Sequence, residues 1–277
     1  MTLVLSCLTQ QFAIQVSDKR VTRIADGQLT DDKRNKGTQF CAQMAFAYSG
    51  LAELGGKNTD IWLAHTLALA PSLNEAVKIV CEKATEQFKQ INCPNDIKRH
   101  AFVGVGWGKQ SENAPLVPIH VTISNALNKN GAWLDTAKEE FEIDAVWLSS
   151  PFALRPPIGA RVSDQDFDEL RKNIRGCVEH ETSPLEIVRL LGETIRKIAT
   201  RNSQGSVGKN LLAIIVPKTS AQSNSFIFSA PLIPKGVNEF DGPTFMDIPA
   251  DIDEATLHIP AFVCEGIVID GGTFTVE

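Results

Sequence analysis

Thr2, which follows Met1, offers an unusual combination of chemical groups. A small residue at this position permits removal of the initiator methionine, so we expect Thr2 to become the N-terminal residue. It would then carry a hydroxyl nucleophile beside an amine that can accept its proton. Because α-amino groups titrate near ~7.7 to 8.0, a useful fraction of this amine is neutral at physiological pH. Many cytoplasmic proteins also begin Met-Thr, so further residues must support a catalytic interpretation.

Charged residues close the apolar run that begins at Phe12, where residues 17–22 read Ser-Asp-Lys-Arg-Val-Thr. Such charges often mark only a solvated strand end. Together with Lys36, however, Asp18 offers a carboxylate and a cation that can pair beneath the N-terminus. A buried cation there favours the ionised hydroxyl during attack. Lys33 is the alternative cation.

Gly50 follows Ser49 at the end of another apolar run and precedes a helical block. Glycine lets the backbone approach a substrate closely. Its N–H can then point at a developing oxyanion. We therefore add Gly50 to the candidate residues.

Other patterns indicate structural roles. Gly104, Gly106 and Gly108 predict a turn at a strand end, because no helix follows them to bind a phosphate. The histidines show no metal-ligand spacing, and the scattered cysteines are interpreted as small buried residues. We expect no metal and no cofactor. The histidines are His65, His100, His120, His180 and His258, and the cysteines are Cys7, Cys41, Cys81, Cys93, Cys177 and Cys264.

Composition indicates a globular protein that binds no nucleic acid. Hydrophobic residues make up 43% and charged residues 22% of the 277 residues, and the formal net charge is -6 without a dense basic patch. No apolar run approaches the length that spans a bilayer, and the N-terminus lacks the features of a secretory signal. We expect a cytoplasmic protein with no membrane association.

The hydrophobic pattern predicts strands, two helices, strands, two helices and further strands. Apolar runs and alternation predict strands, and a period near 3.6 predicts helices. The predicted helices are 60–69, 73–91 with Ser72 as its cap, 167–178, and 184–199 with Ser183 as its cap. The predicted strands are 3–9, 12–18, 39–49, 101–106, 117–124, 145–148, 211–216, 225–229, 262–269 and 273–276. Strand 225–229 is predicted to pair with strand 211–216.

This order predicts an α+β fold in which two antiparallel sheets lie between two helical layers, because the helices come in pairs rather than as single crossovers. Residues 231–255 are rich in proline, glycine and acidic residues and predict mainly loop. We therefore expect one domain over residues 1–230 and a C-terminal extension over 231–277, with loop and late strands packed on the same domain.

The arrangement of these residues resembles the catalytic half of proteasome β subunits and their bacterial relatives, which are N-terminal nucleophile hydrolases. The shared features are an N-terminal threonine, a hairpin that ends in Asp-x-Arg-x-Thr, a lysine before the next hairpin strand and a glycine that ends that strand. Asp18 and Arg20 keep the family's spacing from Thr2; Lys36 and Gly50 keep their mutual spacing after a two-residue insertion. The resemblance covers residues 2 to about 50 at motif level and the element order to about residue 230. It implies a four-layer αββα sandwich.

The resemblance also implies roles for these residues. Thr2 supplies the nucleophile and, through its amine, the general base; Asp18 holds Lys36, whose charge lowers the cost of the alkoxide; Gly50 donates the oxyanion-hole N–H. We favour Lys36 over Lys33 because an apolar residue follows it by four, as in the family. The substrate-binding residues implied are Val21, Thr22 and Tyr48, with Thr22 bonding the substrate main chain and Tyr48 giving a shallow pocket.

Two segments depart from the family pattern. Ser206 and Gly208 match its Asp-x-x-Ser-Gly-Gly motif, but Ser203 stands where the aspartate belongs. Arg20, Ser203, Ser206 and Gly208 are therefore possible supporting residues. The nearest match to the family's Ser-Gly segment is residues 158–160, which offer no hydroxyl.

We expect a threonine-dependent amide hydrolase, a peptidase by preference, that acts on a peptide or amide substrate. The alternatives are an acylase of small amides and a catalytically silent ring-forming or scaffolding protein. The resemblance also implies a homo-oligomer, possibly a ring, because relatives stack through their helical layers.

Overall fold

The computed structural model describes residues 2–23, 28–111, 113–128, 132–202, 205–219, 227–229, 242–250 and 256–275. These residues form a mixed α and β fold with four helices and several sheets, in agreement with the predicted α+β class. The helices are α1 (Thr59–Leu67), α2 (Leu73–Gln90), α3 (Asp164–Glu179) and α4 (Pro184–Arg201). Three begin at a serine whose hydroxyl accepts a backbone N–H of the first turn: Ser72, Ser163 and Ser183.

The first large sheet contains the hairpin that begins the chain. Its seven strands run in the order β12 (Phe152–Leu154), β1 (Leu3–Thr9), β2 (Phe12–Asp18), β14 (Leu211–Pro217), β16 (Thr244–Ile248) and β15 (Ile227–Ser229), with β13 (Ile158–Gly159) also paired to β1.

The second large sheet also has seven strands, and three two-stranded ladders accompany the large sheets. Its order is β11 (Glu142–Trp147), β10 (Val117–Ser124), β9 (Ala101–Gly108), β6 (Met44–Ser49), β5 (Gly37–Phe40), β18 (Phe262–Cys264) and β19 (Ile267–Ile269). The short ladders are β3 (Val21–Thr22) with β4 (Leu29–Asp31), β7 (Glu53–Leu54) with β8 (Lys57–Asn58), and β17 (Thr256–Ile259) with β20 (Gly272–Thr275).

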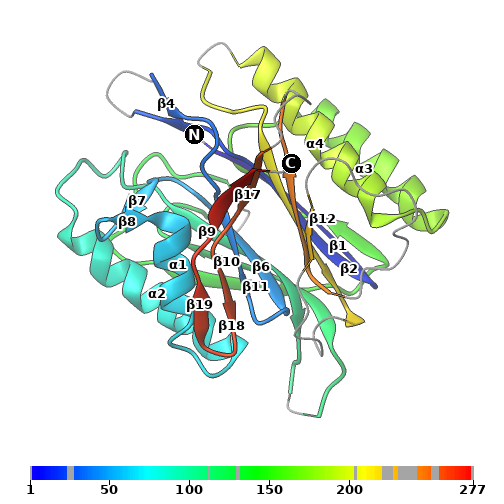
Figure 1. Ribbon diagram of the computed structural model, residues 1–277, viewed down its shortest axis with the longest axis horizontal. Helices are drawn as coiled ribbons and strands as arrows, with labels where there is room; N and C mark the ends of the chain where they lie inside the picture. The colour runs from blue at the N-terminus through cyan, green and yellow to red at the C-terminus, as the bar shows by residue number, and fades with distance from the viewer. Residues whose placement is uncertain are drawn as a thin grey trace.

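Three hydrophobic layers hold these elements together. Helices α3 and α4 pack on the first sheet, and α1 and α2 pack on the second (Figure 1). A third set of apolar side chains joins the two sheets, with Leu212 and Ile214 from the first meeting Val105 and Trp107 from the second. Both sheets therefore bury two faces, which explains why β1 and β14 are continuous apolar runs.

The C-terminal segment adds strands to both large sheets. Strand β16 lies between β14 and β15, and β18 runs parallel to β5. The prediction of mainly loop over 231–255 therefore misses β16, and the predicted pairing of 225–229 with β14 is wrong, because β15 pairs with β16 instead. The run 262–269 is also divided, since Glu265 and Gly266 turn with positive φ.

Two further predictions need correction in the second sheet. The run 39–49 is a hairpin, because the turn at Cys41 and Ala42, both with positive φ, separates β5 from β6. The three glycines predicted as a turn lie inside β9. A Cβ on Gly106 would stand 2.1 Å from the Gln43 carbonyl oxygen, so glycine there permits the close approach of β9 to β6.

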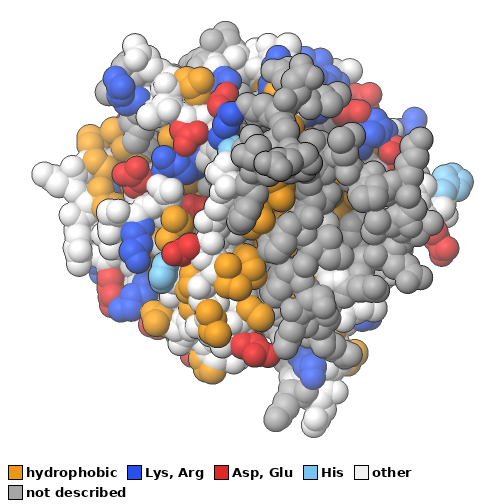
Figure 2. Space-filling view, in the orientation of Figure 1, with side chains coloured by type: hydrophobic (Ala, Val, Ile, Leu, Met, Phe, Trp, Pro, Cys, Tyr) orange, Lys and Arg blue, Asp and Glu red, His pale blue; other side chains and the backbone are white. Residues whose placement is uncertain are grey.

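Among the described residues, five large apolar side chains are exposed: Leu29, Leu69, Ile143, Ile267 and Ile269. Figure 2 shows hydrophobic side chains gathered where β18 and β19 lie, and Ile267 of the edge strand β19 is 66% exposed. In the described part of the chain, no helix has the length and apolar character needed to cross a membrane.

Candidate active site

Thr2 lies directly before β1 and is fixed on both sides by backbone hydrogen bonds. The N–H of Leu3 donates to Asp18 Oδ1 at 2.7 Å, and the N–H of Ala160 donates to the Thr2 carbonyl at 2.9 Å. Gly159 pairs with Leu3, and a Cβ on Gly159 would stand 1.6 Å from the Thr2 carbonyl oxygen. Only glycine fits there, so the segment 158–160 serves Thr2 through its backbone.

The lysine side chain that reaches Thr2 is Lys36. Its Nζ donates to Thr2 Oγ1 at 2.9 Å and lies 3.3 Å from Asp18 Oδ2. It also donates to the Arg20 carbonyl. The hairpin of β5 and β6 positions it, because the N–H of Tyr48 donates to the Lys36 carbonyl at 3.1 Å. The rival Lys33 is exposed, and its backbone N–H bonds the carboxylate of Asp31.

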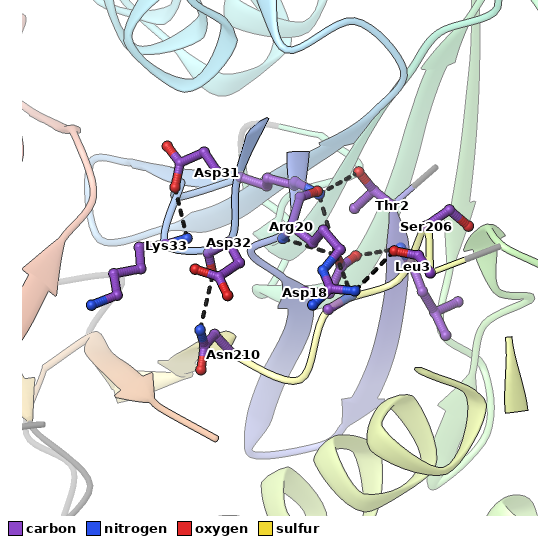
Figure 3. A network of polar contacts seen from close by, with 12 residues as sticks. Thr2, Leu3, Asp18, Arg20, Asp31, Asp32, Lys33, Ser206 and Asn210 are labelled. Carbon is purple, nitrogen blue, oxygen red and sulfur yellow. Dashed lines mark hydrogen bonds and ion pairs between the residues drawn. The ribbon is translucent and has the colours of Figure 1, made fainter. Parts of the chain in front are cut away.

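Asp18 organises the segments around Thr2, as Figure 3 shows. Besides Leu3 and Lys36, the backbone N–H groups of Arg20 and Gly208 donate to Asp18 Oδ2 at 3.0 and 3.1 Å. Asp18 is completely buried, and burying a carboxylate is costly unless hydrogen bonds compensate it. This single carboxylate therefore joins β1, β2, Lys36 and the segment before β14.

Burial controls the electrostatics of the site. Thr2, Asp18 and Lys36 are 3%, 0% and 2% exposed. Burial lowers the pKa of Lys36, while the negative charge and hydrogen bond of Asp18 act in the opposite direction. An ion pair thus lies against the Thr2 hydroxyl in a region from which water is excluded, where charge interactions are strong.

Gly50 is exposed and adopts a φ of +132°, which side chains rarely allow. A Cβ here would stand 2.4 Å from Nδ1 of His100 and 2.7 Å from the Arg99 carbonyl. Its N–H has no hydrogen-bond partner within the described ranges. The next N–H, of Leu51, donates to His100 Nδ1 at 3.1 Å. His100 is buried, and burial lowers its pKa to about 3, so the neutral ring can accept this bond.

The three predicted substrate-binding residues lie in two places. Tyr48 is buried between the second sheet and its helices, stacked on His100 with ring centroids 5.8 Å apart. The Tyr48 hydroxyl is buried and finds no hydrogen-bond partner in the described part of the chain. Val21 and Thr22 form β3, half-buried, directly after the carbonyl of Arg20 that accepts from Lys36.

The possible supporting residues differ in their contacts. Arg20 donates from Nη1 to the Gly205 carbonyl at 2.9 Å. A Cβ on Gly208 would stand 2.7 Å from Arg20 Cβ, so glycine is needed for its N–H to reach Asp18. Ser206 accepts a hydrogen bond from the Asn202 side chain at 2.8 Å. Ser203 lies outside the described residues.

Sequence reasoning missed a second buried ion pair beside the site. Lys19 is 1% exposed, and its Nζ lies 2.9 Å from Oδ1 of Asp247. The other carboxylate oxygen of Asp247, Oδ2, accepts the backbone N–H of His258. The only signal in the sequence is a lysine directly after a buried strand. Its partner lies on β16, in a segment predicted as loop.

Comparison with protein-family models finds no match to this sequence, and comparison with curated proteins finds none either. The geometry of the site is therefore the basis for the function proposed below.

Proposed function

We propose that this chain is a threonine-dependent amide hydrolase whose nucleophile is Thr2, present as the N-terminal residue of the mature protein. The observation that carries the proposal is the contact of Lys36 Nζ with Thr2 Oγ1 at 2.9 Å while Asp18 holds the same amine. A buried lysine against a hydroxyl, fixed by a buried carboxylate, is the arrangement that activates a hydroxyl for attack.

The fold supports the same proposal. We interpret the two sheets and their helix pairs as the four-layer αββα sandwich of N-terminal nucleophile hydrolases, of the type found in proteasome β subunits. In this fold the nucleophile begins a strand of one sheet. Lys36 and Gly50 would reach it from the other sheet, where they flank the β5–β6 hairpin.

In the proposed reaction, the Thr2 amine takes the hydroxyl proton as Oγ1 attacks the substrate carbonyl carbon. The Lys36 ammonium stabilises the developing negative charge at Oγ1, and the Gly50 N–H hydrogen-bonds the carbonyl oxygen as it becomes an oxyanion. Collapse of this intermediate breaks the C–N bond, and the Thr2 ammonium returns its proton to the leaving amine. The same amine then takes a proton from a water molecule that attacks the acyl ester, and this proton passes to Thr2 Oγ1 as the ester C–O bond breaks and the acid is released.

The decisive experiment compares Thr2→Ala with Thr2→Ser and with a surface control, Thr200→Ala. Intact mass and N-terminal sequencing of protein made in cells first establish whether Thr2 is terminal. We expect hydrolysis of a peptide and acyl-amine panel to disappear in Thr2→Ala, to survive in part in Thr2→Ser and to be unchanged in Thr200→Ala. Unchanged turnover in Thr2→Ala, or a retained Met1 in active protein, refutes the proposal.

A second candidate, a catalytically silent scaffold of the same fold, is favoured by the burial of Thr2, which is only 3% exposed. The two candidates give opposite results with an electrophilic inhibitor of N-terminal threonine enzymes. Covalent labelling of Thr2 supports the hydrolase. Failure to label it in protein whose N-terminus is proven to be Thr2 supports the scaffold, and a ring measured by mass photometry would define that role further.

A further inference from the structure

A pocket with several polar side chains lies where the edges of the two large sheets meet. Its volume is about 300 Å³, and β10, β11 and the segment between β12 and β13 line it. This volume is at the lower end of the range for ligand pockets, which suits a small metabolite. The residues that line the pocket include His120, Thr122, Asp144, Arg155 and Ile158.

The pocket exists because β10 has its polar residues on the face that normally builds the core. His120 pairs with Val105, and Thr122 pairs with Val103. Both valines pack between the sheets, and directly paired residues share one face of a sheet, so His120 and Thr122 also point between the sheets. Polar residues on an inter-sheet face are costly unless something satisfies them.

Among the residues that the structure describes, His120 has no such partner. It is 3% exposed, and both ring nitrogens are buried without a hydrogen bond in the described structure. Burial lowers its pKa to about 3, so the ring is neutral and presents one donor and one acceptor. Leaving both unmet is unfavourable, and a ligand in the pocket can meet them.

Two opposite charges border the same space without pairing. Arg155 is fixed by its backbone N–H, which donates to the Ser6 carbonyl at 3.0 Å, while its side-chain Nε is buried and unpaired. Asp144 lies on the opposite wall, directly paired with Thr122 across β10 and β11. Within the described residues, neither charge makes an ion pair within 4.0 Å. Glu142, the other acid of the wall, is already paired with Lys138 at 2.7 Å.

We propose that this pocket binds a small zwitterion of the free amino-acid class, with its carboxylate on Arg155, its ammonium on Asp144 and a polar group on His120. A guanidinium is suited to bidentate recognition of a carboxylate. An anion alone would face Asp144, and a cation alone would face Arg155, so a molecule that carries both charges fits this wall best. The apolar Ile158 would contact its side chain.

The pocket adjoins the Thr2 site, because its residue Ile158 pairs with Val4 and the next residue, Gly159, pairs with Leu3. Thr2, Asp18 and Lys36 do not themselves line the pocket. Ligand binding here does not depend on the proposed hydrolase function, and Thr2→Ala should bind the ligand as the wild type does.

The test measures binding of the twenty free amino acids by ligand-observed NMR and calorimetry, with the N-acetyl derivatives and the primary amides as probes that lack one charge. We expect at least one free amino acid to bind with a Kd below about 10 mM, and each of its two derivatives to bind at least ~10-fold more weakly. No binding by any amino acid, or equal binding by the derivatives, overturns the proposal.

Variants locate the binding to this pocket. Arg155→Gln and Asp144→Asn should each weaken binding at least ~10-fold, a change of about 1.4 kcal/mol. Arg171→Gln and Asp168→Asn remove an exposed pair on α3 and should not change it. Arg155→Lys keeps the positive charge but loses the planar guanidinium that can bind a carboxylate in a bidentate way, so this variant should bind the amino acid less tightly than the wild type. Circular dichroism checks that each variant folds. Undiminished binding in folded Arg155→Gln refutes the assignment.

Discussion

Replacing Asp18 with asparagine tests the site and the fold together. Asp18 Oδ1 accepts the N–H of Leu3, and Oδ2 accepts Arg20, Gly208 and Lys36. An asparagine has one oxygen and one NH2 group, so in either orientation at least one of these donors faces another donor. The substitution keeps the shape of the side chain but cannot satisfy the site.

The magnitude follows from these contacts. If the asparagine oxygen faces the N–H of Leu3, its NH2 group faces Lys36, Arg20 and Gly208. The charged hydrogen bond to Lys36, worth about 1.5–3 kcal/mol, is then lost. The buried N–H groups of Arg20 and Gly208 are left unpaired, at about 1–3 kcal/mol each. Breaking a buried ion pair costs about 3–5 kcal/mol in other proteins. We therefore expect Asp18→Asn to lower the free energy of unfolding by about 3–5 kcal/mol, a large share of the stability of a typical domain.

Urea unfolding, followed by fluorescence and circular dichroism, measures this change. The midpoint should fall by about 1 M or more with little change in the slope. Asp168→Asn is the control, because this exposed carboxylate pairs only with Arg171 on the same helix, and we expect less than about 1 kcal/mol. An Asp18→Asn protein within about 1 kcal/mol of the wild type would refute the network as described.

Three further variants test other features of the structure. Burial raises the pKa of the Asp60 carboxyl from 3.8 to about 6, so the folded state holds a proton that the unfolded state releases at lower pH. The free energy of unfolding of the wild type should therefore fall by about 3 kcal/mol as pH rises from about 4 to about 6. Asp60→Asn should remove this pH dependence in urea titrations across that range. Asp247→Ala removes a buried carboxylate that lies 2.9 Å from Lys19 Nζ and should cost about 3–5 kcal/mol in the same assay. A double change of both residues to apolar ones should partly reverse this loss. If the proposed hydrolase function holds, Gly50→Ala should reduce amide hydrolysis by ~100-fold because the proposed oxyanion donor moves. Gly56→Ala, with open space around its Cβ position, should leave kcat/KM unchanged.

The hairpin and helices were predictable because their signals are local. The bounds of β1, β2 and β10 agree with the prediction, since each is an apolar or alternating run closed by polar residues. The helix at Leu73 begins as predicted because Ser72 accepts the N–H of Glu75. Periodicity and capping are properties of the segment itself, so the sequence suffices for them.

The late strands were not predictable in the same way. Strand β16 has five residues, and its place between β14 and β15 depends on partners elsewhere in the chain. The nearby proline, glycine and acidic residues favour loop, and pairing with β14 overrides that local preference. The Lys19 contact with Asp247 was hidden for the same reason, because nothing local in the sequence indicates a pairing across 228 positions.

The candidate site could be predicted from the sequence only in part. The two-residue turn of the first hairpin sets the register of Val4 with Ser17, which places Asp18 beside Leu3. That proximity follows from counting residues. The choice of Lys36 over Lys33 came only from the family spacing to Phe40, because the position of Lys36 depends on where β5 begins and on how the second sheet packs against the first.

Variants of Asp18 and of Thr2 give different kinds of evidence, because the two side chains make different contacts. Asp18 holds three backbone segments in place, so a loss of activity in Asp18→Asn would follow equally from lost chemistry and from a displaced N-terminus. Within the described ranges, the Thr2 side chain has one hydrogen bond, from Lys36, and its backbone contacts do not involve the hydroxyl. A Thr2→Ala protein should therefore keep its stability within about 1–2 kcal/mol, so that a complete loss of hydrolysis would report on the hydroxyl itself. A stable Thr2→Ala protein with wild-type hydrolysis would remove the chemical role and leave Lys36 as a structural cation.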